Sequence, residues 1–189
     1  MKTGKIPESV LKRSVLRQLH NRRDEVLLGA GVGEDCAALT LEADEVFVMS
    51  TDPITGTGKE MGSLAVITTA NDLASSGAEP VGVMLTILLP EATCEKFHMQ
   101  ILGGHTEVSA AVNRPVISVS GVGKVKKDAM IKTGGARPGM DIVVSKWIGI
   151  EGTVILAKER ERELLGRYAT TFIDRAKDLD AYISVLSEA

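Results

Sequence analysis

The segment from Met61 to Ala78, MGSLAVITTANDLASSGA, limits the folds open to this chain more than any other feature. Its length and its apolar and small residues predict a helix that is buried against the rest of the domain. Asp72 is the only charged residue in it. Because burial removes an ionised carboxylate from water at a high energetic cost, Asp72 needs a cation or several hydrogen-bond donors beside it. The alternative is that Asp72 caps a turn or pairs with a single lysine or arginine.

Three further acidic residues also lie at places where a soluble chain would rarely put a charge. Asp35 follows a glycine-rich turn, Asp52 lies at a strand end, and Glu107 follows a Gly-Gly bend. Magnesium prefers carboxylate oxygens and phosphates as ligands, and several carboxylates together can hold ions that also bind a triphosphate. Asp35, Asp52, Asp72 and Glu107 therefore suggest a magnesium and nucleotide site.

Length and charge exclude several classes of protein. The 189 residues suffice for one domain of ordinary size and a short extension. A formal net charge of -3 provides no basic field for nucleic acid. No apolar run reaches membrane-spanning length and the N-terminus lacks the apolar core of a signal peptide, so we expect a cytoplasmic protein. The two cysteines, Cys36 and Cys94, fit a reducing compartment.

The apolar pattern predicts a mixed order of helices and strands. We expect a flexible arm at Met1–Ile6, an amphipathic helix at Glu8–Leu19, strands at Glu25–Gly29 and Glu45–Ser50, the buried helix, a strand at Val81–Leu89 that is buried on both faces or at an interface, a short helix from Thr93 leading into Ile101–Gly104, strands at Pro115–Val125 and Asp141–Trp147, and a helical tail from Thr153 to Leu186. Gly77 and Pro80 end the buried helix.

Three glycine-rich segments do not match the common phosphate motifs. Gly29–Gly33 follows a strand, but Glu34 stands where a dinucleotide fingerprint needs its third glycine. Gly56–Lys59 is similar to the end of a P-loop, but Pro53 occupies the first glycine position. Gly134–Gly139 is typical of a turn. The chain also lacks the elbow motif of serine hydrolases, and its histidines show no metal-ligand pattern.

Six spaced motifs together resemble a known family. They are Gly31–Leu39, Ser50–Pro53, Gly62–Val66, Asn71–Ala74, Gly77–Pro80 and Gly103–Glu107, in that order. The chain resembles the N-terminal half of the aminoimidazole ribonucleotide (AIR) synthetase superfamily. That family also includes thiamine-monophosphate kinase, selenophosphate synthetase and the hydrogenase maturation protein HypE. The resemblance covers the chain from Lys5 to Trp147.

The resemblance implies an α/β (α+β) domain in which a four-stranded sheet with flanking helices pairs with the sheet of a second subunit, forming an eight-stranded barrel and a homodimer. It implies an N-terminal ATP-binding and dimerising domain at 1–147 and the helical start of a truncated C-terminal domain at 148–189. ATP and Mg²⁺ would lie along the cleft between the two domains. The apolar strands Val81–Leu89 and Pro115–Val122 also favour a dimer, because exposed strand edges invite aggregation.

The resemblance also assigns roles to individual residues. Asp35, Asp52 and Asp72 are the implied magnesium ligands, and the implied nucleotide-binding residues are Lys5, Gly31, Gly33, Thr51, Asn71, Gly104 and Thr106. Gly31 and Gly33 would let the backbone approach the phosphates closely. Lys5 would close over the nucleotide as a counter-charge; a surface lysine without a role is the alternative. No catalytic residue is assigned.

Three departures from the family pattern bear on these roles. His105 stands where family members commonly carry Asp or Glu, so a metal ligand is lost unless Glu107 replaces it. The segment between Pro90 and Ile101 is shorter than the family's. Family members also continue beyond the position of Ala189 into a second domain that contains much of the acceptor pocket.

Two classes of function remain open. The leading one is an ATP- and magnesium-dependent, ligase-like or kinase-like enzyme, of which this chain supplies the nucleotide-binding half. It would carry out phosphoryl transfer or ATP-driven activation of an amide or similar acceptor, with a small molecule or a protein as acceptor and with no nucleic acid or membrane as partner. The alternative is a non-catalytic nucleotide-sensing or dimerisation module, favoured by His105 and the missing second domain. A small acyl or phosphate hydrolase has only the carboxylates in its favour.

Overall fold

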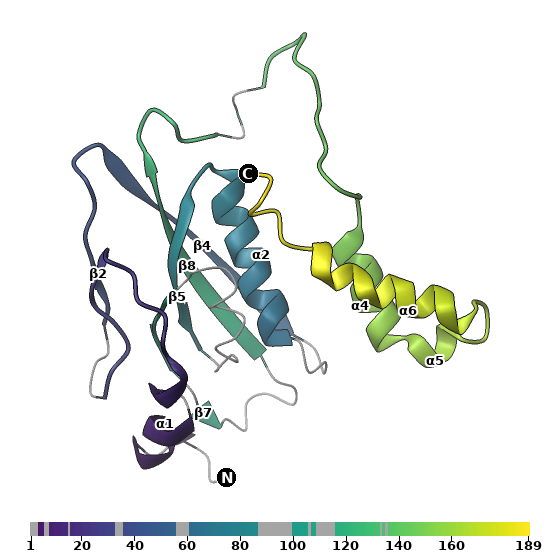
Figure 1. Cartoon of the computed structure of the whole chain (residues 1–189), viewed down its shortest axis with the longest axis horizontal. Helices are drawn as coiled ribbons and strands as arrows, with labels where there is room; N and C mark the ends of the chain where they lie inside the picture. Colours follow the sequence, from purple (N-terminus) through teal and green to yellow (C-terminus); the bar gives the residue numbers. More distant parts are fainter. Residues whose placement is uncertain are drawn as a thin grey trace. The chain divides into compact units, whose positions relative to one another are not determined.

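The computed structural model describes residues 4–5, 8–14, 16–32, 36–55, 61–86, 100–105, 107–108, 116–132, 134 and 136–189 (Figure 1). The chain forms two compact units, Met1–Lys132 and Thr133–Ala189, which are described separately. The expected helix from Thr93 lies outside the described residues. None of the helices among these residues is both long and apolar enough to cross a membrane.

A four-stranded mixed sheet forms the centre of the first unit. Its strands lie in the order β4 (Glu45–Thr55), β8 (Val116–Lys126), β5 (Glu79–Leu85) and β6 (Gln100–Gly104). β8 is antiparallel to both its neighbours, and β5 is parallel to β6. The α/β class and the four-stranded sheet are thus confirmed. The reason given for a dimer was wrong, because β5 and β8 are inner strands whose edges are paired within the chain, and the outer edges belong to β4 and β6.

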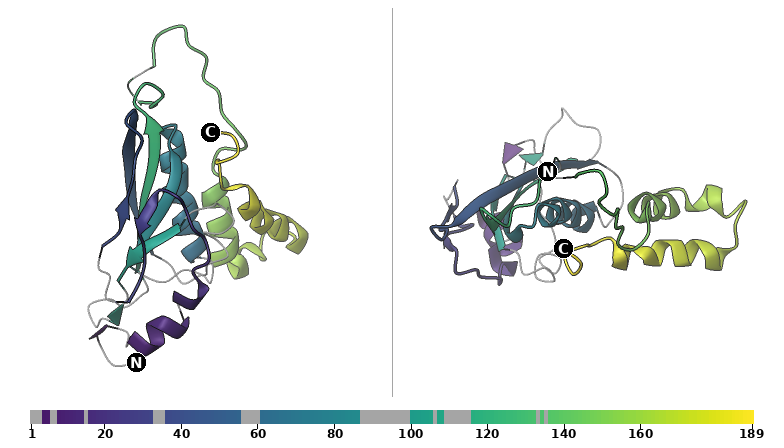
Figure 2. Two further views of the ribbon diagram at one scale, coloured as in Figure 1. Left: turned by 60° about the vertical axis from the view of Figure 1, so that its left-hand side comes forward. Right: turned by 90° about the horizontal axis from the view of Figure 1, so that it is seen from above.

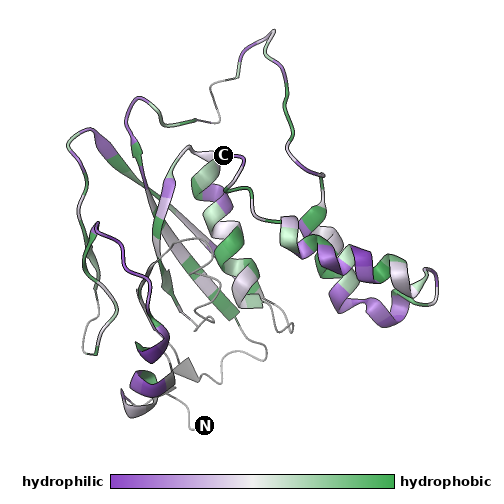
Figure 3. Cartoon of the chain, viewed as in Figure 1, coloured by the Kyte–Doolittle hydropathy of each residue, from purple (hydrophilic) through white to green (hydrophobic). Residues whose placement is uncertain are grey.

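Helix α2 (Met61–Ser75) covers one face of this sheet, as the sequence predicts (Figure 1). Its residues Ala65, Val66, Thr69 and Leu73 are almost completely buried, because positions three and four apart share one side of a helix. Figure 3 shows that most of α2 ranges from neutral to hydrophobic. The turn after the helix contains Gly77, whose φ of 72° suits a residue without Cβ.

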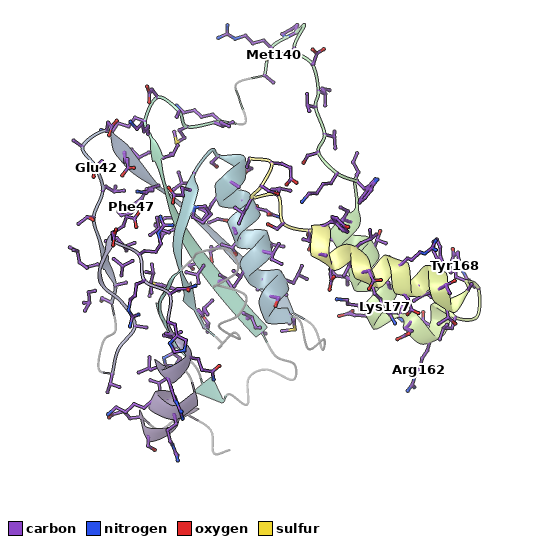
Figure 4. All side chains as sticks on the ribbon, in the orientation of Figure 1. Glu42, Phe47, Met140, Arg162, Tyr168 and Lys177 are labelled. Carbon is purple, nitrogen blue, oxygen red and sulfur yellow. The ribbon has the colours of Figure 1, made fainter. Side chains whose placement is uncertain are left out.

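The sheet face opposite α2, here called the open face, contains several exposed apolar side chains. Phe47 is 41% exposed, Met49 73% and Met84 39%. Phe47 and Met49 alternate along β4 with residues that face α2, as the two-residue period of a strand requires. Figure 2 shows α2 beside one face of the sheet, and Figure 4 labels Phe47.

Two small sheets accompany the main one. β2 (Val26–Leu28) pairs with β3 (Ala38–Leu39), a strand that the sequence did not indicate. β1 (Gly4–Lys5) pairs with β7 (Glu107–Val108). Of the arm expected at Met1–Ile6, the structure describes only Gly4 and Lys5, which pair with β7; the flexibility of the arm stays a prediction. The expected helix at Glu8–Leu19 consists of α1 (Glu8–Ser14) followed by a 3₁₀ turn at Leu16–Gln18.

An ion-pair network connects the segment before β2 to the main sheet. Arg23 donates two hydrogen bonds to the Glu25 carboxylate, at 2.9 and 3.1 Å, and a third to Glu79 at 2.7 Å. The Lys124 ammonium lies 2.7 Å from Glu25 and 3.6 Å from Glu45. Arg23 first, and Lys124 after it, lower the pKa of Glu25 from 4.5 to about 2. Residues from β4, β5 and β8 are thereby linked to one largely buried carboxylate.

The second unit is helical. Its elements are α4 (Ile150–Glu159), α5 (Glu161–Leu164), α6 (Thr170–Asp178) and a 3₁₀ turn at Leu179–Tyr182. The prediction that this tail is helical is confirmed, although the tail is divided into several short helices. Ile150, Val154, Ala157, Ile173 and Ile183 are its buried apolar residues. Lys177, labelled in Figure 4, pairs with Glu161 at 2.5 Å.

The expected strand at Asp141–Trp147 was wrong. The segment is irregular, and within the described part of the chain no strand pairs with it. Ile142 is 92% and Val143 88% exposed. Strand-forming residues are not sufficient here, because a strand also needs a neighbour that accepts and donates its backbone hydrogen bonds.

Candidate functional site

The candidate site lies between strand β4 and helix α2. Ser50 and Asp52 are two positions apart on β4, so both side chains point toward the face that α2 covers. Asp72 comes from the C-terminal half of α2. The apolar residues that bury α2 against the sheet thereby fix the spacing between the strand and the helix that carry these polar groups.

Two carboxylates meet at this place. The Ser50 hydroxyl donates a hydrogen bond of 2.7 Å to Oδ2 of Asp72. Oδ2 of Asp52 is buried and has no hydrogen-bond partner among the described residues. Burial raises the pKa of Asp52 above its ordinary value, and the neighbouring Asp72 carboxylate raises it further. In this environment the ionised form of Asp52 is destabilised, as expected for a carboxylate that is desolvated beside another one.

A divalent cation would remove this electrostatic penalty. Carboxylates are the protein ligands that Mg²⁺ prefers, and Mg²⁺ sites commonly use one or two of them together with water and substrate phosphates. The orphaned oxygen of Asp52 and the adjacent Asp72 fit such a site. Within the described ranges, no group of three or more His, Cys, Asp or Glu side chains is arranged to hold a metal. Among the described residues, the geometry therefore supports Asp52 and Asp72 as a pair of ligands.

The predicted burial of Asp72 was wrong. Asp72 is exposed, because it lies at the edge of the α2 face that packs on the sheet, from where its carboxylate still reaches Ser50 on β4. The apolar composition of the helix concealed this exposed edge. Its predicted need for a partner is nevertheless met in part, by the hydroxyl of Ser50.

The other predicted nucleotide-binding residues are placed as follows. Asn71 is half-buried on α2 next to Asp72, and Gly31 is half-buried in the loop after β2. Thr51 lies on the open face, where its hydroxyl is 3.0 Å from that of Ser120, so its side chain is not brought together with Asp52 and Asp72. At Gly104 a Cβ would lie 1.7 Å from the carbonyl oxygen of Leu85. Close backbone packing alone thus explains that glycine.

Several predicted residues are not positioned by the structure. Asp35, Gly33 and Thr106 lie outside the described residues. For Lys5 and Glu107 the backbone is described and the side chains are not; the two residues are direct partners between β1 and β7. Their roles in binding metal or nucleotide remain predictions.

Sequence reasoning missed Ser50. The signal was present, because Ser50 and Asp52 are polar residues at alternate positions of a strand whose other inward residues, Val46 and Val48, are apolar. Two polar side chains on the inner face of a strand indicate a polar contact with whatever covers that face.

Comparison with known proteins indicates the family to which this fold belongs. Residues 33–125 match the family described as AIR synthase related protein, N-terminal domain. A putative hydrogenase expression/formation protein of Methanocaldococcus jannaschii is 30% identical in an alignment of length 173 that covers 81% of this chain and 51% of that protein. A carbamoyl dehydratase HypE of Cupriavidus necator is 31% identical over 153 residues, 69% of this chain and 44% of that protein.

A thiamine-monophosphate kinase of Methanospirillum hungatei is 30% identical over 136 residues, 61% of this chain and 46% of that protein. The chain therefore spans about half the length of the curated relatives it matches.

Solved structures show the same fold. A thiamine-monophosphate kinase from Stenotrophomonas maltophilia has a TM-score of 0.60 at 23% identity, over 84% of this chain and 54% of that one. The hydrogenase maturation protein HypE in complex with ATP has a TM-score of 0.61 at 23% identity, over 81% of this chain and 50% of that one.

Proposed function

Because this chain belongs to the AIR synthase related superfamily, we propose that it is the nucleotide-binding half of an ATP- and magnesium-dependent enzyme. The observation that carries the proposal is the Asp52–Asp72 pair. Two carboxylates are brought together although one of them is destabilised in its charged form, and one of its oxygens has no partner among the described groups. Such an arrangement is expected where a cation is bound during function.

In this proposal both residues of the pair hold the same ion. Asp52, from the sheet, and Asp72, from the helix, would together hold Mg²⁺ against the phosphates of ATP. The bound ion would neutralise charge on the triphosphate during transfer. Without it, the two carboxylates would repel the nucleotide, so they make binding conditional on the metal.

The reaction class follows from the relatives. Their names include a kinase and a carbamoyl dehydratase, and one relative with this fold was solved with ATP. We therefore infer phosphoryl transfer or ATP-driven activation of an amide or similar acceptor. The acceptor would be a small molecule or a protein.

We also propose that the chain acts as a homodimer in the cytoplasm. The open face supports the dimer, because Phe47, Met49 and Met84 expose apolar surface together on one side of the sheet. A second copy that presents the same face would bury these side chains in a symmetric contact.

A second candidate is a nucleotide-sensing or dimerisation module without catalysis. His105 favours it, because the resemblance places an acid at this position. His105 is exposed, and its backbone N–H donates to the carbonyl of Leu85 at 2.8 Å.

Release of ADP distinguishes the two candidates. The purified chain is incubated with ATP and Mg²⁺, and Asp52→Asn serves as the background. For an enzyme we expect ADP release above that background; binding of ATP with release equal to the background would favour the sensing module. Failure to bind ATP at all would contradict the enzyme and the sensing module, and would leave only a dimerisation module.

A further inference from the structure

We propose that Ser50 is a positioning residue that orients Asp72 for the divalent cation. The inference deepens the proposed function and rests on it. Ser50 begins the motif Ser50–Pro53, but the sequence assigns it no role, and it is the structure that places its hydroxyl on the carboxylate of Asp72.

The geometry of the contact supports this role. Ser50 precedes Asp52 by two positions on β4, so one strand face supplies both the proposed ligand and the hydroxyl that contacts the other ligand. The distance of 2.7 Å from the Ser50 hydroxyl to Oδ2 of Asp72 is typical of a hydrogen bond to an ionised carboxylate. Such a bond occupies one lone pair and leaves the others for a cation.

The exposure of Asp72 explains why it needs such a contact. An exposed aspartate on a helix surface samples several rotamers, and binding of a metal would have to select one of them. The hydrogen bond from half-buried Ser50 selects a rotamer on the side of Asp52 before the metal arrives. Groups that hold ligands in this way typically change metal affinity by about 10–100-fold when they are removed.

A matched control exists on α2. The Ser75 hydroxyl also donates to Asp72, at 2.7 Å, but it contacts the backbone carbonyl and not the carboxylate. Ser50→Ala and Ser75→Ala therefore each remove one serine hydroxyl that donates a hydrogen bond to Asp72. Only Ser50→Ala affects the orientation of the Asp72 carboxylate.

The test is binding of Mn²⁺ alone, used as a probe for the Mg²⁺ site and followed by the loss of the free-ion paramagnetic resonance signal. The full chain is compared with Ser50→Ala, Ser50→Thr, Ser75→Ala and Asp72→Asn. We expect about tenfold weaker binding in Ser50→Ala and unchanged binding in Ser75→Ala. Ser50→Thr should restore most of the affinity, because threonine retains the hydroxyl and suits a strand. Thermal unfolding checks that each variant folds.

Two results would overturn the proposal while leaving the proposed function intact. The first is that Ser50→Ala binds Mn²⁺ as tightly as the unsubstituted chain does, while Asp72→Asn binds it more weakly. The second is that Ser50→Ala and Ser50→Thr lose the same amount of Mn²⁺ affinity. If the unsubstituted chain binds no more Mn²⁺ than Asp72→Asn, the metal pair itself is wrong, and the role of Ser50 is overturned with it.

Discussion

At the scale of single residues, Asp52 and Asp72 couple the stability of the fold to metal and pH. The pKa of Asp52 is raised in the folded protein, so the folded state holds this proton more tightly than the unfolded chain does. The stability of the metal-free protein therefore falls as the pH rises from the ordinary pKa of 3.8 through the raised folded value.

Replacement of Asp52 should stabilise the metal-free protein. Asp52→Asn removes the charge that burial and Asp72 destabilise, so we expect a melting temperature higher by a few degrees in chelator at neutral pH. Added Mg²⁺ should stabilise the unsubstituted protein and not the variant. Calorimetric unfolding with chelator or Mg²⁺ measures both effects, and equal responses of the two proteins to Mg²⁺ would contradict the assignment.

The sequence predicted Asp52 and Asp72 but not the way in which they meet. A single charge in an apolar helix identified Asp72, yet its exposure depends on which side of α2 faces the sheet. Ser50 was missed because its alternation with Asp52 indicates only a polar contact on the inner face of β4, and does not identify Asp72 as the partner. The site was thus predictable where charge is unusual for its surroundings, and not where function depends on a contact between distant elements.

At the scale of elements, two sets of contacts hold the helices and strands of the first unit together. The Arg23–Glu25–Lys124 network fastens the segment before β2 to the sheet, and α2 packs closely on β8. The sequence predicted that α2 would be buried, but it indicated neither the ion-pair network nor the strand against which α2 packs, because opposite charges and glycines are common. The order of the main elements was predicted well by contrast, since it depends on local apolar periodicity.

The Glu25 network should contribute stability that acid removes. Because the pKa of Glu25 is lowered to about 2, its contribution is complete above the ordinary value of 4.5 and is lost as the pH falls toward 2. Glu25→Gln should lower the free energy of unfolding by on the order of 2 kcal/mol at pH 7. The difference from the unsubstituted chain should shrink in acid; urea unfolding at several pH values measures it.

Asp44→Asn is the control, because Asp44 pairs with Lys126 at 3.2 Å in solvent. It should leave stability nearly unchanged. A Glu25→Gln effect no larger than that of Asp44→Asn would show that the network adds nothing to stability.

Close packing of α2 on β8 requires glycine at position 121. A Cβ there would lie 2.6 Å from Cγ2 of Thr69 and 3.1 Å from Cδ1 of Leu73, and both residues are fully buried. Gly121→Ala should therefore destabilise the protein by about 1–3 kcal/mol. Denaturant unfolding measures the change.

Gly152→Ala, in α4, is the control, because we expect it to increase stability where Gly121→Ala decreases it. Apart from the adjacent backbone of its own helix, no described atom lies within 4 Å of a Cβ at Gly152, so alanine should stabilise the helix by about 0.5–1 kcal/mol. Destabilisation by Gly121→Ala no greater than a few tenths of a kcal/mol would contradict the close approach of α2 to the sheet.

At the scale of the whole molecule, the sequence predicted the fold class and the helical second part, but it did not predict which surfaces remain open. Strand propensity at Asp141–Trp147 failed because the described chain provides no neighbouring strand. The division into domains at residue 147 stays a prediction. The open face of the sheet became visible only once α2 had been placed on the other side.

The open face should mediate the homodimer. Met49, 73% exposed, is the most exposed of its three large apolar side chains, so Met49→Lys would bury a charge in the contact. We expect sedimentation at micromolar concentration to show a dimer for the unsubstituted chain and a monomer for Met49→Lys. Leu156→Lys, at an exposed position of α4, should remain dimeric. A stable monomer for the unsubstituted chain would contradict the prediction.

The central claim is that the chain binds adenine nucleotide through magnesium held by Asp52 and Asp72. The most direct measurement is calorimetric titration of ATP with Mg²⁺ and with a chelator, on the unsubstituted chain and on Asp72→Asn. We predict binding that requires Mg²⁺ and is at least about tenfold weaker in Asp72→Asn, because removing a ligand charge weakens the hold on the ion. ATP affinity that is unchanged by the chelator, or unchanged in Asp72→Asn, would contradict the claim.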